Sequence, residues 1–128
     1  MRVLLDTHVF LWALFEPERL SKNVQKLLED PKTGIVLSAA SIWEISTKHR
    51  LGRLSHASYL VENLDQAIES LRAEELPITR AHALKAGGWQ VVHRDPFDRV
   101  LAAQAALEDL PLITADPAFQ AFNIETDW

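Results

Sequence analysis

Arg2-Val3-Leu4-Leu5-Asp6-Thr7-His8 opens the chain with a short apolar run that ends abruptly in a carboxylate. An apolar run of this length, without polar alternation, is typical of a strand that is buried on both faces, as in a parallel sheet. Ligands of such sheets bind just beyond the carboxyl ends of the strands. Asp6 is therefore placed where we expect chemistry, although a carboxylate there could instead cap the helix that follows.

The bulk properties of the chain indicate an ordinary globular protein. Its 128 residues suffice for one compact domain, so we interpret residues 1–128 as a single domain. The absence of cysteine excludes disulfides and thiolate metal sites. No secretory leader and no membrane-length apolar run is present, which makes a soluble cytoplasmic protein without membrane contact the simplest expectation. The net charge of -5 argues against a protein that coats polyanions, but it allows a nucleic-acid enzyme whose acids gather around metal ions.

Strands and helices are predicted to alternate along the chain. A second apolar strand is expected at 35–37, followed by a helix that ends at about Arg50. The strongest helix is expected at 100–107, with another short strand after it at 112–114. This strand-then-helix order indicates an α/β domain built on a parallel sheet.

Three further elements are predicted from weaker patterns. The apolar stripe over 59–71 predicts one amphipathic helix that packs on the core. The segment 74–78 is expected to form an edge strand or a strand end, because Pro77 lacks a backbone donor. Asn123-Ile124 is the expected last edge strand.

Four carboxylates are expected to meet at one edge of this sheet. Asp6 and Asp116 directly follow buried strands, whereas Glu44 and Asp98 lie in the first turns of helices that flank the sheet. Besides the capping alternative for Asp6, two of the others have a plain structural alternative: Glu44 could form an i,i+4 surface pair with Lys48, and Asp116 could cap a turn that begins with proline.

Asp95 and Asp98 have different expected roles at the start of the helix 100–107. Asp95-Pro96 has the form of a helix start, with an acid at the N-cap and proline at the first helical position. Asp98 instead falls on the small-residue face that should pack against the sheet, where a carboxylate is costly unless a cation or several donors meet it. Asp98 is therefore better explained by a metal, and Asp95 stays a candidate to support it from outside.

Several carboxylates at one partly buried edge would repel each other and raise their pKa values unless cations were bound. Oxygen ligands, without cysteine or clustered histidine, favour Mg²⁺ or Mn²⁺ over zinc. Such a site suits the hydrolysis of phosphodiesters. The five histidines are scattered, and we expect ordinary surface or core roles for them.

Four segments resemble, in order, the acidic motifs of the PIN domain: Leu4 to His8, Ser41 to Ile45, Asp95 to Arg99 and Leu112 to Asp116. Residues 43–54 and 95–99 also resemble the VapC-type toxin branch of that family. The resemblance implies an α/β/α sandwich around a central parallel sheet and an endoribonuclease that depends on Mg²⁺ or Mn²⁺. It also implies inhibition by a small cognate antitoxin, usually a VapB-like DNA-binding protein, and homodimerisation.

The resemblance also assigns roles to individual residues. The family's catalytic, metal-binding acids fall on Asp6, Glu44, Asp98 and Asp116. Thr114 matches a hydroxyl residue near the fourth acid and is expected to contact substrate. Three cations are expected to contact RNA phosphates because they are close to the acids in sequence: Lys48, Arg50 and Arg99.

Two other functions stay open from the sequence. One is a catalytically silent PIN-like domain that binds nucleic acid or regulates, and keeps its acids for structure. The other is a phosphoryl-transfer enzyme with Asp6 as nucleophile, similar to haloacid-dehalogenase-like phosphatases. Those enzymes carry Asp-x-Asp after the first strand, and His8 stands at the second position here, which counts against this function.

Overall fold

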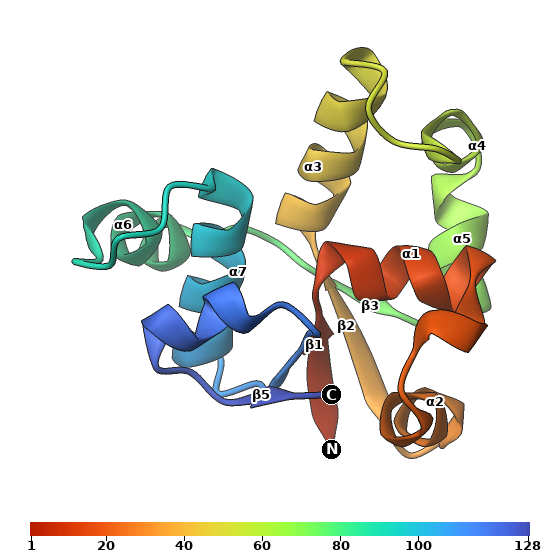
Figure 1. Cartoon of the computed structure of the whole chain (residues 1–128), viewed down its shortest axis with the longest axis horizontal. Coiled ribbons are helices and arrows are strands. Elements are labelled where there is room, and N and C mark those ends of the chain that lie inside the picture. The colour runs from red at the N-terminus through yellow and green to blue at the C-terminus, as the bar shows by residue number, and fades with distance from the viewer.

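A computed structural model describes all 128 residues and has a single sheet at its centre (Figure 1). The five strands have the spatial order β3-β2-β1-β4-β5, and every neighbouring pair is parallel. Their bounds are Arg2–Leu5 for β1, Gly34–Ser38 for β2, Glu74–Leu76 for β3, Leu112–Ile113 for β4 and Thr126–Asp127 for β5. In a fully parallel sheet all carboxyl ends lie at one edge, so each strand delivers its following residue to the same side of the molecule.

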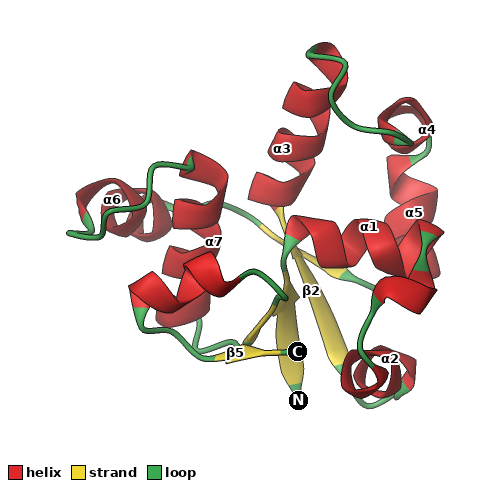
Figure 2. Ribbon diagram, in the orientation of Figure 1, coloured by secondary structure: helices red, strands yellow, loops and turns green.

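Helices cover both faces of the sheet (Figure 2). In chain order they are α1 (Thr7–Phe15), α2 (Lys22–Glu29), α3 (Ala39–Arg50), α4 (Ala57–Glu62), α5 (Leu64–Ser70), α6 (Arg80–Gly88) and α7 (Pro96–Leu107), with short 3-10 helices η1 (Pro17–Arg19) and η2 (Pro117–Phe122). The predicted α/β/α sandwich is confirmed. None of these helices has the length and apolarity that crossing a bilayer requires.

β1 is the central strand, as its apolar run Val3 to Leu5 predicts. Val3, Leu4 and Leu5 are completely buried, and β1 pairs with β2 on one side and β4 on the other. Val3 and Leu5 pack into the core that is shared with α1, α2, α4 and α5, whereas Leu4 packs with α7 and η2 on the opposite face. The alternation of side chains along one strand thus joins both helical layers.

The predicted helix over 59–71 is wrong, because two shorter helices, α4 and α5, occupy that segment. They separate at Asn63, whose backbone φ of -127° and ψ of 29° is not helical. The Asn63 side-chain amide donates to the carbonyl oxygen of Tyr59 at 2.9 Å. Asparagine competes in this way for backbone groups that a continuous helix would use, so the apolar stripe continues across a bend.

The last strand, β5, lies three residues beyond its predicted position at 123–124. Asn123 adopts a left-handed conformation, with φ 53° and ψ 44°, and ends η2. A residue in this region cannot extend a strand, so pairing with β4 begins only at Thr126.

Candidate active site

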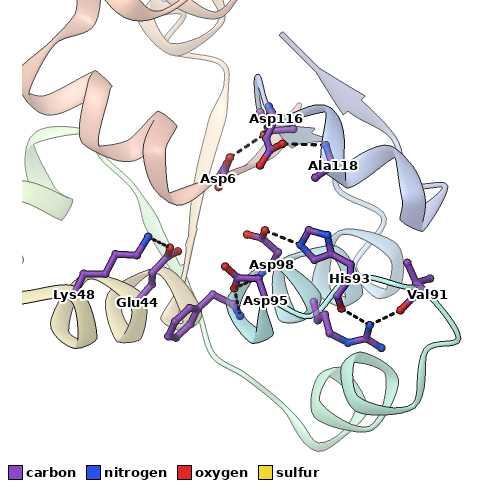
Figure 3. Close-up of polar contacts among 12 residues, drawn as sticks. Asp6, Glu44, Lys48, Val91, His93, Asp95, Asp98, Asp116 and Ala118 are labelled. Carbon is purple, nitrogen blue, oxygen red and sulfur yellow. Dashed lines mark hydrogen bonds and ion pairs between the residues drawn. The ribbon is translucent and has the colours of Figure 1, made fainter. Parts of the chain in front are cut away.

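The four predicted acids gather at the carboxyl edge of the sheet (Figure 3). Asp6 directly follows β1, and Asp116 follows β4 at the start of η2. Glu44 comes from the second turn of α3, and Asp98 comes from the first turn of α7. Helices start immediately after strands here: the Ser38 side chain at the end of β2 accepts from the Ala40 amide and starts α3 without a loop.

Asp6 is buried and is held by a side chain from the neighbouring strand. Its carboxylate makes no capping hydrogen bond to α1, so the capping alternative is wrong. Thr114 Oγ1 donates to Asp6 Oδ2 at 2.8 Å and accepts from the Asp116 amide at 3.0 Å. Burial raises the pKa of Asp6, and the charge of Glu44 adds to that rise, whereas the Thr114 hydrogen bond and His8 oppose it. The structure gives Thr114 a positioning role towards Asp6, and its contact with substrate stays a prediction.

Glu44 forms the i,i+4 pair that the sequence allowed, but not on the surface. Only 4% of Glu44 is exposed, and Lys48 Nζ donates to its Oε2 at 2.6 Å. A buried hydrogen bond of 2.9 Å from the Thr7 hydroxyl to the Ser41 hydroxyl ties the start of α1 to α3. Glu44 is therefore held next to Asp6, and the structure pairs the Lys48 ammonium with a carboxylate.

Asp98 is the second carboxylate of the site whose pKa is raised. Its Oδ2 lies 2.9 Å from Nε2 of His93, a residue in the loop before α7. The pKa of Asp98 is raised to about 6, chiefly by burial; the charges of Asp95 and Asp6 add to the rise, and the contact with His93 opposes it. The sequence did not reveal His93, because a loop histidine five residues before an acid has no fixed geometry.

The two acids that precede prolines are helix caps, as their sequence context allowed. Asp95 Oδ1 accepts from the amides of Phe97 and Asp98 at 2.9 and 3.2 Å. Asp116 Oδ1 accepts from the Ala118 amide at 2.9 Å. Both side chains are exposed, and each keeps a second carboxylate oxygen beyond its cap.

Arg99 points into the protein and not towards solvent. Its Nε donates to the Ala86 carbonyl at 2.7 Å, and Nη1 donates to the carbonyls of Val91 and His93 at 2.9 and 2.8 Å. Nη2 donates to the Trp89 carbonyl. The structure thus shows Arg99 as a support of the loop between α6 and α7, and its contact with phosphate stays a prediction. Arg50 lies exposed at the end of α3, and its contact with phosphate stays a prediction.

An open hollow of about 340 Å³ lies beside the acids and is lined by Asp6, His8, Trp12, Arg19, Ala115 and Asp116. The Arg19 guanidinium carbon lies 4.6 Å from the centre of the Trp12 ring and so brings a positive charge to this hollow. Sequence reasoning missed Arg19, because it is far from every acidic motif along the chain.

The chemistry of these donors fits a hard divalent cation. Asp6, Glu44 and Asp98 supply carboxylate oxygens, and burial raises the pKa of two of them, which a cation would reverse. In the arrangement observed, no three acids or histidines lie close enough together to hold an ion. Each of the four carboxylates is instead held by a neighbour: the Thr114 hydroxyl, the Lys48 ammonium, the His93 imidazole or the Ala118 amide. In this arrangement the four carboxylates do not share one binding position, and their side chains would have to move before they could hold one cation together.

A sequence profile of the PIN domain matches residues 3–125. The chain belongs to the PIN domain family. This membership confirms the predicted resemblance and argues against the phosphatase alternative. Among curated proteins, no sequence matches this PIN domain.

Solved structures with a similar fold include chains from three named assemblies. VapBC2 from Rickettsia felis, bound to a DNA fragment from its promoter, superposes with a TM-score of 0.71 at 17% identity, covering 99% of this chain and 98% of that one. FitAcB from Neisseria gonorrhoeae has a TM-score of 0.62 at 26% identity, with coverage of 98% and 96%. VapBC-1 from nontypeable Haemophilus influenzae has a TM-score of 0.62 at 19% identity, with coverage of 99% and 97%.

Proposed function

We propose that this PIN domain is a metal-dependent endoribonuclease that acts as the toxin of a type II toxin-antitoxin pair. The observation that carries the proposal is the convergence of Asp6, Glu44 and Asp98, from three elements, in a partly buried edge of the sheet. Membership of the PIN family and the likeness to chains of VapBC assemblies support it.

In this proposal Asp6 and Asp98 hold Mg²⁺ or Mn²⁺, with Glu44 and Asp116 in support. The bound cation supplies Lewis acidity, which makes hydroxide available near neutral pH and neutralises charge on the phosphodiester. The chain's own contribution is to orient the carboxylates before RNA arrives: Thr114 fixes one oxygen of Asp6 and leaves the other available.

Two exposed cations, one beside the acids and one farther along α3, would receive the RNA backbone. Arg19 lines the hollow next to Asp6 and Asp116, and Arg50 is exposed at the far end of α3. Lys48 neutralises Glu44 while no cation is bound; its side chain is 31% exposed and is long enough to turn to a phosphate once the carboxylate has another partner.

We also propose a small VapB-like antitoxin as the inhibitory partner, together with a homodimer of this chain. The support is the likeness to chains from VapBC and FitAB assemblies, of which FitAcB is 26% identical to this chain. Copurification of the two proteins after coexpression, with loss of the ribonuclease activity, would test the partner.

The experiment incubates purified protein with total tRNA and small structured RNAs, in Mn²⁺ or in EDTA. Cleavage is expected in Mn²⁺ and not in EDTA. In Mn²⁺ it is expected to fall sharply for the Asp6→Asn and Asp98→Asn variants. Asp65→Asn, an exposed carboxylate on α5, is the matched control and should cleave like the wild type. Equal cleavage in EDTA, or full cleavage by both site variants, would overturn the proposal.

A catalytically silent nucleic-acid-binding domain is the second candidate, and one observation favours it. Every acid of the site already has a hydrogen-bond partner within the protein, so the acids could serve the fold alone. Binding of single-stranded RNA that is unaffected by Mn²⁺, without turnover, would support this candidate over the nuclease.

A further inference from the structure

His93 is fixed on several sides although it belongs to a loop. Its imidazole packs against two rings of η2, with ring centroids 6.4 Å from Phe119 and 5.3 Å from Phe122. Only 17% of the side chain is exposed, and Nε2 lies 2.9 Å from Asp98 Oδ2. An ionised carboxylate only accepts hydrogen bonds, so Nε2 carries the hydrogen and donates it.

The backbone of this loop depends on Arg99 for its conformation. Within residues 89–93 the only backbone hydrogen bonds run from Val91 to Trp89 and from His93 to Val91, at 2.8 and 3.0 Å. The Arg99 guanidinium supplies further hydrogen bonds to this backbone, because it donates to three carbonyls of the loop and to that of Ala86. Since Arg99 is on α7, one turn from its start, the helix that carries Asp98 also fixes the residue that contacts Asp98.

The hydrogen bond matters because Asp98 is half-buried among like charges. Asp95 and Asp6 both repel its ionised form, and His93 opposes them. Because His93 holds Oδ2, the Asp98 carboxylate is fixed in one orientation, and its other oxygen, Oδ1, stays available to a cation. Donors that orient metal-binding carboxylates in this way typically change metal affinity 10- to 100-fold when they are removed.

We propose that His93 is a positioning residue that orients Asp98 for a divalent cation, and that Arg99 acts through His93. The inference rests on the proposed function, in which Asp98 binds the metal. It gives Asp98 the same kind of support that Thr114 gives Asp6, from a different element.

The test measures the dissociation constant for Mn²⁺ by calorimetry and the urea unfolding of the metal-free protein. His93→Phe keeps a ring between Phe119 and Phe122 but removes the donor; we expect Mn²⁺ affinity to fall about 10- to 100-fold. His93→Gln restores an N–H and should recover part of that loss. The two substitutions also guard against a folding defect, because only one of them keeps the donor.

His82→Gln is the matched control. His82 is buried and its Nε2 lies 3.0 Å from Glu108 Oε2, so it forms the same kind of pair away from the site. This variant is expected to lose stability and to bind Mn²⁺ like the wild type. If His93→Phe behaves in the same way, losing stability alone, His93 is merely structural and the proposal is overturned.

Arg99 gives an independent arm of the test. Arg99→Lys keeps the charge but cannot reach four carbonyls, so it should weaken Mn²⁺ binding, and adding it to His93→Phe should cause little further loss. Additive losses would overturn the claim that Arg99 acts through His93. If Asp98→Asn leaves Mn²⁺ affinity unchanged, the proposed metal site itself fails; if it abolishes binding while His93→Phe does not weaken it, only the positioning role fails.

Discussion

Asp6 and Asp98 place negative charge where water has little access, and this lowers the stability of the folded protein. Burial is the largest cause of the raised pKa of each; the charge of Glu44 adds to the rise at Asp6, and the charges of Asp95 and Asp6 add to the rise at Asp98. A fold selected for stability alone would place neutral residues at these positions. The site is therefore expected to trade stability for the ability to attract a cation.

Asp98→Asn should make the metal-free protein more stable at neutral pH. The folded pKa of Asp98 is about 6, above the ordinary 3.8, so the folded state binds more protons between these values. The contribution of Asp98 to the free energy of unfolding is thus fully present below about pH 4, where the carboxyl is protonated in both states. It declines as the pH rises through about 6 and is lost above that pH, where the buried group is ionised. One pKa unit corresponds to about 1.4 kcal/mol, and after a discount for water access we expect a gain of about 1–2 kcal/mol.

The measurement is urea unfolding in EDTA at several pH values between 4 and 8. The variant should gain over the wild type as pH rises and then keep a constant advantage. Asp65→Asn, at an exposed site, should show no such divergence. A variant less stable than the wild type at pH 8 would contradict the assigned burial cost.

At the scale of elements, helix starts place the acids of the site. α1 and α3 begin directly at the ends of β1 and β2, and α7 begins at the Asp95 cap. The starts of α7 and η2 were predictable, because a helix cap is an interaction between residues close in sequence: Asp95-Pro96 and Asp116-Pro117 each have the form of a cap followed by proline. The break at Asn63 was not, since its apolar stripe runs on through both helices.

For the site, the positions of the acids could be predicted from the sequence, but their hydrogen-bond partners could not. Carboxylates that follow apolar strands of a parallel sheet must meet at one edge, so the positions of Asp6 and Asp116 followed from local pattern and topology. Their partners did not follow. His93 meets Asp98 only because Arg99 holds a loop without regular structure, and Arg99 itself appears as a surface cation when read along the sequence. Contacts of this kind depend on tertiary packing.

Asp95 caps α7 and also carries a negative charge, and two substitutions distinguish these two effects on stability. Asp95→Ala removes the acceptor for two amides and should cost about 0.5–2 kcal/mol of unfolding free energy. Asp95→Asn keeps an acceptor at the N-cap and removes a charge that repels Asp98, so its stability should at least equal that of the wild type. Urea unfolding at pH 7.5 compares the three proteins. Equal losses in both variants would show that charge, and not the cap, is what Asp95 contributes.

At the scale of the whole molecule, the site exists only when the sheet is assembled. Its acids come from four segments that are far apart in sequence, at positions 6, 44, 98 and 116. An ion that binds all of them binds the folded state and has no comparable site on the unfolded chain. Metal binding and global stability should therefore be linked.

Mn²⁺ is expected to raise the melting temperature of the wild type in a concentration-dependent way. At one hundred times its dissociation constant, the ion should add about 2.7 kcal/mol to the free energy of unfolding. The Asp6→Asn, Asp98→Asn double variant should melt at the same temperature with and without Mn²⁺. Scanning calorimetry over a Mn²⁺ series makes the comparison; an equal shift in the double variant would place the ion elsewhere.

The two outer strands have a consequence for how copies of this protein could meet. β3 has three residues and β5 has two, and both edges carry acids, Glu74 and Glu75 on one side and Asp127 on the other. Strands this short and this acidic are poor templates for a further strand. Extension of the sheet from one molecule into the next is thereby discouraged, and the proposed homodimer would have to form through helical surfaces.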